Sequence, residues 1–368
     1  MALMKVLCCL LVSLAVAEAA VHRIPITRKH VTLASINRFL TAANGDVEPV
    51  VTRDGESFYS GNITVGTPAQ TFVTDFDTGS ADLWIMDDTC QDDDCKDTPV
   101  FHKDRSSTYK SDNVPESIAY VDGSYTTGVR GFESITFGNI SVDSQPFILA
   151  NKSHQNDVIK SIFGLGSQDI AQTGSPPFYT AVAQKAVDKP ILTVFLKKSA
   201  DNTFGGEVTL GDYDTENCGP IYSTTNAVGS DWYVRIDGVS INGKQVSTTG
   251  SVTGVVDTGT TYLVLPFDLS EAFEAINEKV KLEEVKGGYT LQCTDSDKIP
   301  DLTITIDGYN HIINGYQLAI PVKGAEDTCV LALAGMPFGE TLLGDTFIRD
   351  RCVSQNIQTK EISFAHKK

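Results

Sequence analysis

Basic side chains are scarce in this 368-residue sequence, which has 29 lysines and arginines against 47 aspartates and glutamates. The net charge of −18 argues against nucleic acid or an anionic membrane surface as a partner. Metal-binding spacings are also missing, because none of the six histidines forms a His-x-x-x-His pair and no Cys-x-x-Cys occurs. We therefore expect neither a metal site nor another cofactor.

Long hydrophobic runs are confined to the first residues of the chain. Lys5 is followed by an apolar run at 6–16 and then by the small-residue pattern Ala-Glu-Ala at 17–19. The run is too short to span a bilayer, and the order of these features predicts a secretory signal peptide at 1–19. No later segment could span a membrane, so we expect a protein that is secreted or directed to the lysosomal lumen.

Charge divides the remainder of the chain. Residues 20–45 have a net charge of +4, whereas residues 46–368 carry 24 basic and 46 acidic side chains, a net of −22. We expect the basic arm to be attracted to the acidic body, and this attraction to weaken as carboxylates protonate. The alternative is a disordered leader with no role. The basic residues of the arm are Arg23, Arg28, Lys29 and Arg38.

Strand-like alternation of apolar and polar residues dominates from residue 57 onward, interrupted by turns rich in glycine, asparagine and aspartate. Helical patterns are few, and the candidates are 176–187 and 269–280. The pattern predicts a mainly β protein with many hairpins and a few surface helices. The length is sufficient for two units, each with its own core.

An internal repeat is the most informative feature of the sequence. The run FVTDFDTGSADLWI at 72–85 has a counterpart, VTGVVDTGTTYLVL, at 252–265. Each Asp-Thr-Gly is followed, 87 residues after its aspartate, by the glycine of an apolar-apolar-Gly pattern, at Gly164 and Gly344. Two such pairs at equal spacing predict two copies of one β lobe.

A single Asp-Thr-Gly is ordinary turn chemistry, since all three residue types favour tight turns. Two related lobes packed about a two-fold axis would place Asp77 and Asp257 side by side. Two adjacent carboxyl groups cannot both ionise easily, so one keeps its proton. Such a pair can hold a water molecule, remove its proton and polarise a substrate carbonyl, which is general acid–base hydrolysis of an amide.

These motifs resemble those of the pepsin-like aspartic endopeptidases, whose shared-proton mechanism is the one just described. The resemblance includes GTPAQ at 66–70, ADLW at 81–84 and LGDTFIR at 343–349, and it extends over residues 57–368. It implies a bilobal, mainly β fold with a central cleft, protein or peptide substrates, action at acidic pH, and a monomer. The domains that it implies are a short prosegment at 20–45, an N-terminal lobe at 46–218 and a C-terminal lobe at 219–368.

The resemblance also assigns roles to individual residues. Hydroxyl groups of both motifs would hold the catalytic carboxylates, while the motif glycines would allow their close approach. Tyr120 would lie at the tip of a β-hairpin flap over the substrate, hydrogen-bonded to Trp84; the alternative for Tyr120 is an ordinary half-buried strand residue. The assignments are Asp77 and Asp257 for the catalytic pair; Thr78, Gly79, Ser80, Thr258, Gly259 and Thr260 for its support; and Tyr120, Val121, Asp122, Gly123, Trp84, Asp75, Ile159 and Ile162 for the flap and substrate pocket.

Two departures from the family pattern keep a second function open. The family usually has glycine where Val121 stands, and Asp-Gly where Lys160 and Ser161 stand. They keep open a non-catalytic relative that binds peptides or glycoproteins, whereas the intact Asp-Thr-Gly motifs in both lobes argue against it. A two-carboxylate glycosidase is a third hypothesis, which the duplication disfavours. The prosegment also lacks an obvious lysine that could reach the catalytic pair.

Six cysteines follow the signal peptide, an even number that fits an oxidising compartment. The resemblance implies three disulfides, one of which is an extra pair typical of nematode digestive members of the family. Asn-x-Ser/Thr tripeptides predict glycosylation. The implied pairs are Cys90–Cys95, Cys293–Cys329 and the extra Cys218–Cys352, and the glycosylation candidates are Asn62, Asn139 and Asn151.

Asp75 and Asp82 lie close to Asp77 in the first motif. We expect Asp82 in an exposed turn. Residues two apart in a strand share a face, so Asp75 points the same way as Asp77, at a position where most relatives have an apolar residue of the substrate pocket. We hypothesise that Asp75 accepts a basic side chain of the substrate or raises the pKa values of the pair by like-charge repulsion. The alternative is a carboxylate satisfied by a nearby lysine or backbone amide.

Overall fold

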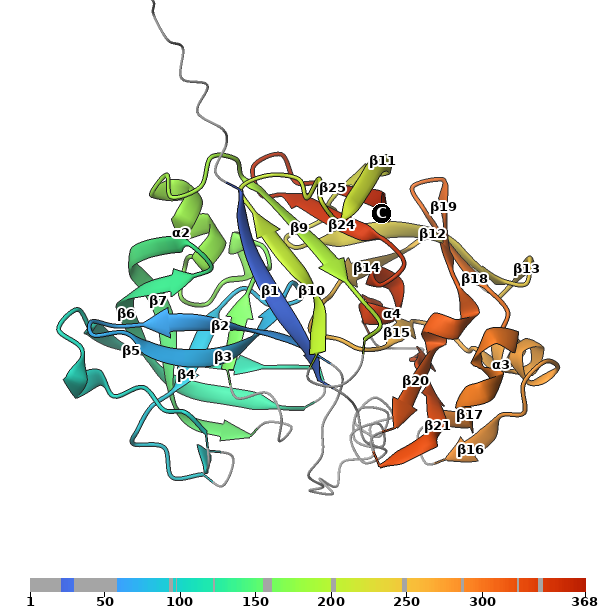
Figure 1. Ribbon diagram of the computed structural model, residues 1–368, viewed down its shortest axis with the longest axis horizontal. Helices are drawn as coiled ribbons and strands as arrows, with labels where there is room; N and C mark the ends of the chain where they lie inside the picture. Colours follow the sequence, from blue (N-terminus) through green and yellow to red (C-terminus); the bar gives the residue numbers. More distant parts are fainter. Residues whose placement is uncertain are drawn as a thin grey trace, which may run out of the picture.

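The computed structural model of the chain describes most of residues 21–368 (Figure 1). It is mainly β, with strands in three sheets and a few short helices, so the predicted fold class is confirmed. No helix in the described ranges is long and apolar enough to cross a membrane. The described residues are 21–29, 58–92, 95–96, 98–121, 123–154, 161–199, 203–246, 250–285, 288–322, 324–336 and 340–368.

A sheet of thirteen strands runs through both halves of the protein, where the N-terminal half is the chain up to residue 218 and the C-terminal half is residues 219–368. Strands from the end of the chain lie in it beside strands from the first half, so the sheet joins the halves. In spatial order its strands are β11 (Cys218–Asn226), β25 (Glu361–Lys367), β24 (Cys352–Asn356), β9 (Ile191–Leu196), β10 (Thr203–Leu210), β1 (His22–Lys29), β2 (Phe58–Val65), β3 (Gln70–Asp77), β8 (Ser161–Gly164), β4 (Leu83–Met86), β7 (Ile140–His154), β6 (Tyr125–Phe137) and β5 (Lys110–Ala119).

The C-terminal half contains two further sheets. One has eight strands: β19 (Tyr309–Ile313), β18 (Leu302–Ile306), β12 (Tyr233–Ile241), β14 (Val252–Val256), β23 (Leu342–Leu343), β15 (Leu263–Leu265) and β22 (Leu333–Gly335) in order, with β13 (Lys244–Gln245) beside β12. The other has four strands: β16 (Glu283–Val285), β17 (Gly288–Gln292), β21 (Ala325–Leu331) and β20 (Ala319–Val322).

The helices are short. α2 (Pro177–Ala183) and α3 (Ser270–Asn277) lie within the two predicted helical stretches. Proline in the first turn suits the start of α2, because its fixed φ is helical and its missing N–H is not needed there. α4 (Asp345–Ile348) directly follows Gly344 and is fully buried. Short 3-10 helices are η2 (Lys103–Arg105), η3 (Gln168–Ile170), η4 (Cys293–Lys298) and η5 (Gly315–Leu318).

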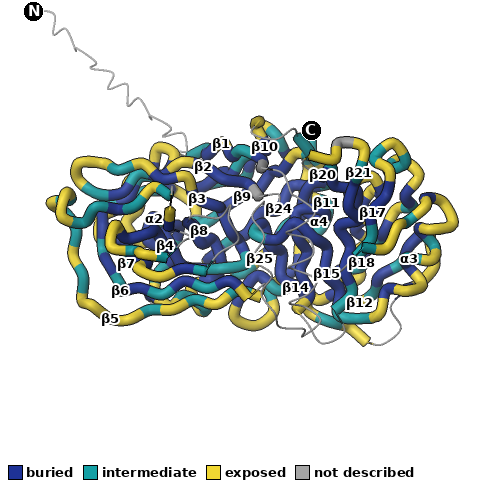
Figure 2. The backbone as a smooth tube through the Cα atoms, turned by 90° about the horizontal axis from the view of Figure 1, so that it is seen from below, coloured by how far each residue is buried: buried dark blue, intermediate teal, exposed yellow. Residues whose placement is uncertain are grey.

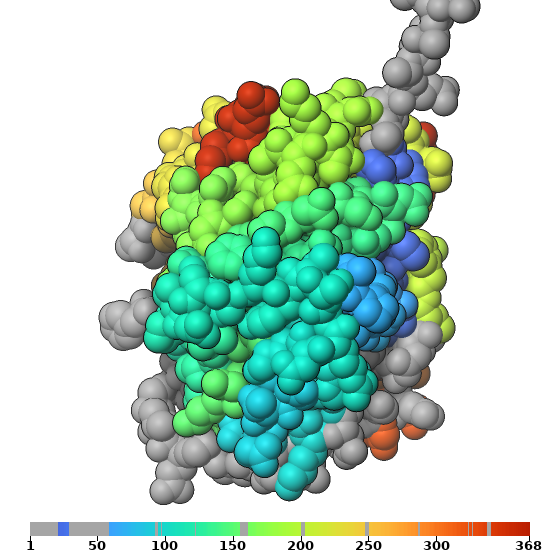
Figure 3. All heavy atoms as spheres, turned by 90° about the vertical axis from the view of Figure 1, so that its left-hand side faces the viewer, coloured from blue at the N-terminus to red at the C-terminus, as the bar shows by residue number. Residues whose placement is uncertain are grey.

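The two copies of the repeated motif have the same local topology. β3 pairs in parallel with β8, which pairs antiparallel with β4. In the second copy β14 pairs in parallel with β23, which pairs antiparallel with β15. A Cβ on Gly164 would overlap backbone atoms of Ala81 and Asp82, and one on Gly344 would overlap those of Thr260 and Tyr262. The packing of each strand against the segment that follows its Asp-Thr-Gly motif therefore requires glycine. Strands of both copies form the buried interior (Figure 2), and the N-terminal half forms one end of the molecule (Figure 3).

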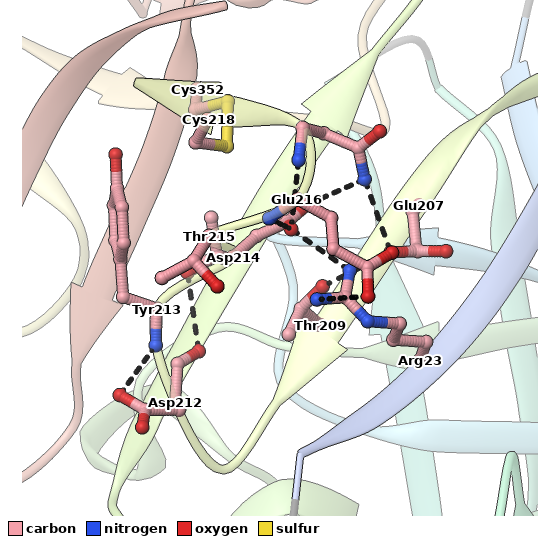
Figure 4. Close-up of polar contacts among 12 residues, drawn as sticks. Arg23, Glu207, Thr209, Asp212, Tyr213, Asp214, Thr215, Glu216, Cys218 and Cys352 are labelled. Atoms are coloured by element: carbon pink, nitrogen blue, oxygen red, sulfur yellow. Dashed lines mark hydrogen bonds and ion pairs between the residues drawn. A yellow bond between two sulfur atoms is a disulfide. The ribbon is translucent and has the colours of Figure 1, made fainter. Parts of the chain in front are cut away.

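β1 comes from the basic arm and lies in the middle of the thirteen-stranded sheet. It pairs antiparallel with β10 along its length and with β2 at its end. Arg23 of β1 donates to Glu207 at 2.5 Å and to Asp214 at 2.8 Å, and Glu216 is 3.6 Å away (Figure 4). Residues 22–29 therefore form a strand bound to acidic side chains of the body, and not a disordered leader.

Three disulfides are present, with the pairings that the resemblance implies. Cys218–Cys352 joins β11 to β24, two strands of the sheet that connects the halves (Figure 4). The other two lie within single halves. The asparagines of the three glycosylation tripeptides are exposed, and their glycosylation stays a prediction.

Candidate active site

Asp77 and Asp257 lie together at the junction of the two halves. Asp77 is the last residue of β3, and Asp257 directly follows β14. Each carboxylate lies against the glycine of the other motif. A Cβ on Gly79 would overlap the carboxylate of Asp257, and one on Gly259 would overlap that of Asp77. A larger residue at either glycine would therefore push the two carboxyl groups apart.

The two carboxylates are held by equivalent hydrogen bonds. The backbone N–H of Gly79 donates to Oδ1 of Asp77 at 2.8 Å, and the hydroxyl of Ser80 donates to Oδ2. In the second copy the corresponding glycine N–H donates to Oδ1 of Asp257 at 2.8 Å, and Thr260 Oγ1 donates to Oδ2 at 2.5 Å. Each motif thus fixes the orientation of its own carboxylate.

Thr78 and Thr258 join the two loops to each other. The Thr78 hydroxyl donates to the Val256 carbonyl at 2.7 Å and accepts from the N–H of Thr258 at 3.0 Å. The Thr258 hydroxyl donates to the Phe76 carbonyl at 2.6 Å and accepts from the N–H of Thr78 at 2.9 Å. These two hydroxyls therefore bind the backbone of the opposite loop and not the carboxylates, which corrects the role predicted for them. They set the separation of the pair.

Burial changes the acidity of the pair. Burial, and then the negative charge of Asp77, raise the pKa of Asp257 well above its ordinary value. A hydrogen bond between the two side chains adds to this increase, while the donors Thr260 and Gly259 oppose it. The pair therefore retains one proton at pH values where an isolated carboxyl group is ionised.

The hairpin of β5 and β6 brings residues 120, 121 and 124 of its tip to the same site. The N–H of Gly123 donates to the Tyr120 carbonyl at 3.0 Å, and its φ of 83° is a left-handed conformation that favours glycine. The Tyr120 hydroxyl accepts a hydrogen bond of 2.8 Å from Nε1 of the fully buried Trp84. Val121 is 54% exposed, and with Tyr120 it lines the space above the aspartates.

A cavity of about 270 Å³ is lined by both aspartates, both halves and the hairpin tip. Ile162 of β8 forms part of its wall, whereas Asp122 and Ile159 lie outside the described residues. Within the described ranges, no group of three or more histidine, cysteine or acidic side chains is arranged to hold a metal ion. The described lining includes no lysine, arginine or histidine, and its acidic members are Asp75, Asp77, Asp82, Asp231, Asp257 and Glu340.

Asp82 is only 3% exposed, so the prediction that it lies in an exposed turn is wrong. Its carboxylate accepts hydrogen bonds of 2.8 Å from the N–H groups of Gln172 and Thr173 and one of 2.6 Å from the Thr173 hydroxyl. Buried carboxylates are stabilised by several such donors. Asp82 therefore holds the segment around residue 172 against the first motif.

Sequence reasoning missed two acidic residues of the cavity, Asp231 and Glu340. Asp231 accepts a hydrogen bond of 2.9 Å from the N–H of Ser167. Burial raises the pKa of Asp231 to about 6, although backbone N–H groups of Ser167 and Trp232 oppose the increase. Glu340 accepts a hydrogen bond from the hydroxyl of Tyr233. Neither acid stands in a motif, and only the fold brings them to the site.

The fold and the paired aspartates together define a site of the aspartic peptidase type. The family model for eukaryotic aspartyl proteases matches residues 58–367. Mouse cathepsin E is 30% identical over 382 aligned residues, which cover 94% of this chain and 94% of that protein. Rhizopuspepsin-4 of Rhizopus niveus is 32% identical, covering 88% of this chain and 81% of that protein. Aspartic protease 1 of Caenorhabditis elegans is 31% identical, covering 84% and 82%. The chain belongs to the eukaryotic aspartyl protease family and is an aspartic-type endopeptidase.

Proposed function

We propose that this protein is a secreted or lysosomal endopeptidase that hydrolyses proteins at acidic pH with a water molecule activated between Asp77 and Asp257. The observation that supports the proposal most strongly is the reciprocal packing of the two carboxylates against Gly79 and Gly259 in a shared cavity. Each carboxylate has hydrogen-bond donors from its own motif, so both are already oriented before a substrate binds.

Burial and the neighbouring charge of Asp77 raise the pKa of Asp257, which supports one proton shared by the pair. In the proposed reaction the ionised member of the pair removes a proton from water, while the protonated member donates its proton to the oxygen of the scissile carbonyl. The resulting tetrahedral intermediate collapses when its C–N bond breaks. The leaving nitrogen takes a proton from the pair, and one hydroxyl of the intermediate gives its proton back to the pair as the product carboxyl group forms. No covalent bond forms between enzyme and substrate, and each cycle returns the pair to one proton.

The tip of the hairpin is the proposed flap. Its tyrosine is held from below by Trp84, so Tyr120 can cover the substrate without collapsing onto the aspartates. We assign the space between the flap and the aspartates to an extended peptide, whose backbone would cross the cavity with side chains directed alternately to either side.

We also propose that residues 20–45 are a prosegment, with the lobes at 46–218 and 219–368. The ion pairs of Arg23 and the place of β1 in the central sheet support the first assignment. The start of β11 at Cys218 supports the boundary between the lobes. The signal peptide expected at 1–19 lies outside the described ranges. Lys29, the lysine of residues 20–45, is the last residue of β1.

The proposal is tested by incubating the acid-treated protein with denatured haemoglobin at about pH 3 to 5, with and without a transition-state mimic of aspartic peptidases. We expect cleavage that the mimic blocks and that Asp257→Asn abolishes. Glu283→Gln, which changes an exposed acid of β16, is the control and should cleave like the wild type. Binding of the mimic without cleavage would support the non-catalytic alternative, and cleavage by Asp257→Asn would exclude the proposed mechanism.

A further inference from the structure

Asp75 occupies an unusual place in the cavity. It lies on β3 two residues before Asp77, on the same face of the strand, and it is 3% exposed. Its neighbour across the sheet is Ile162, which also lines the cavity. Successive residues on one face of a strand are about 7 Å apart, so Asp75 stands one side-chain position away from the reacting centre.

Asp75 lacks the hydrogen bonds that satisfy the other supporting acids of the cavity. Asp82, Asp231 and Glu340 each accept at least one hydrogen bond from a protein donor. Neither carboxylate oxygen of Asp75 has a hydrogen-bond partner among the described residues. The backbone amide of Tyr59 lies close enough to favour the ionised form slightly, but it does not make a hydrogen bond of good geometry.

The surroundings of Asp75 favour a positive charge. Burial, followed by the charges of Asp77, Asp345 and Asp257, raises the pKa of Asp75 well above its ordinary value. The described lining of the cavity offers no basic side chain that could offset these charges. An unsatisfied carboxyl group in such a place is costly, and it becomes favourable when a cation with N–H donors binds.

We propose that Asp75 binds the charged side chain of a lysine or arginine that flanks the scissile bond, and that it directs cleavage to basic sites. The proposal rests on the proposed function, because it places the substrate backbone across Asp77 and Asp257. A residue next to the scissile bond projects along the strand that carries both Asp77 and Asp75. Asp75 and Ile162 both line the cavity, and this is where the proposed contact with the long side chain of the substrate forms.

A second group without a partner lies beside Asp75 in the sheet. Ser60 of β2 is paired with Asp75 in the β2–β3 register, is buried, and its hydroxyl has no hydrogen-bond partner in the described structure. A lysine ammonium group has three N–H donors and a guanidinium group has five, so either can donate to the carboxylate of Asp75.

The test compares two peptides that differ in one residue flanking the scissile bond, lysine in one and norleucine in the other. Norleucine keeps an unbranched alkyl chain but has no ammonium group. Two such pairs place the varied residue before or after the bond, and mass spectrometry of the products verifies the cut. The readout is the ratio of kcat/KM for lysine over norleucine in wild type, Asp75→Asn and Asp75→Val, with Glu283→Gln as a charge-matched control.

We expect the wild type to prefer lysine in one pair, and both Asp75 variants to lower that ratio about 10- to 100-fold, as loss of a hydrogen bond to a charged group predicts. Glu283→Gln should keep the wild-type ratio. Wild-type enzyme that cleaves both peptides of each pair equally would overturn the proposal even if the variants fail to fold, and so would an unchanged ratio in Asp75→Asn. Failure of the wild type to cleave any peptide, with or without lysine, would instead refute the proposed function.

Discussion

Replacing Arg23 by glutamine tests whether ion pairs hold β1 in the central sheet. Arg23 donates at 2.5 Å to Glu207 and at 2.8 Å to Asp214, whose side chain is fully buried. A hydrogen bond to a charged group contributes about 1.5 to 3 kcal/mol. Asp214 keeps donors from Asn217 and from the backbone N–H of Glu216, so its charge is not left unsatisfied. We expect Arg23→Gln to lower the free energy needed to open β1 by about 2 kcal/mol, which corresponds to about 30-fold more frequent opening of that strand.

The contribution of this contact should disappear in acid. Burial alone would raise the pKa of Asp214, but hydrogen bonds from Arg23 and Asn217 lower it below its ordinary value. A carboxyl group with a lower pKa in the folded state stabilises that state above its unfolded pKa, and the contribution is lost as the pH falls through the folded value. The effect of Arg23→Gln should therefore be complete at neutral pH and shrink below about pH 4.

Native-state hydrogen exchange of the β1 amides measures both effects. The proteins carry Asp257→Asn so that self-cleavage does not consume them, and rates are corrected for intrinsic exchange at each pH. Lys281→Gln is the matched control, because it also removes a positive charge but its ion-pair partner is the exposed Glu283. Exchange in Arg23→Gln that equals the control at neutral pH would refute the reasoning, as would a difference of the same size at about pH 2.

Three further results are expected. Thr78→Val should lower kcat/KM, and it should lower the free energy of unfolding by about 3 kcal/mol because the Val256 carbonyl and the Thr258 N–H lose their partner. Thr78→Ser keeps the hydroxyl, so its free energy of unfolding should fall much less. Removing the Cys218–Cys352 disulfide, whose ends are 134 residues apart, should lower the free energy of unfolding by about 5 kcal/mol in chemical denaturation. The lysine preference that depends on Asp75 should rise with pH as its carboxyl ionises, and a preference that falls as the pH rises would contradict this role.

Features that recur within the sequence could be predicted from it. The two Asp-Thr-Gly motifs at equal distance from Gly164 and Gly344 predicted the duplicated lobes, and the structure has the same strand pairing in both copies. The period of two in a strand placed Asp75 on the face of Asp77, and both line the cavity. Such patterns are local, so the sequence carries them without reference to the fold.

Contacts between distant segments could not be predicted in this way. Asp82 looked like a turn residue because its donors, Gln172 and Thr173, are about ninety residues further along the chain. The sequence does not distinguish Arg23 from the other basic residues of the arm, whereas the fold places its guanidinium group against Asp214. The hydroxyl of Thr78 was assigned to its own motif, whereas the structure uses it to bind the other loop. In each case long-range packing, which no local pattern encodes, selects the partner.

The contribution of both aspartates to one reaction is measured most directly by kcat/KM for Asp77→Asn, Asp257→Asn and the double variant on a single peptide. If the two carboxyl groups act as a unit, either single change should lower kcat/KM at least about a thousandfold, and the double change should lower it little further. Substantial activity in either single variant, or losses that multiply in the double variant, would contradict the shared-proton mechanism.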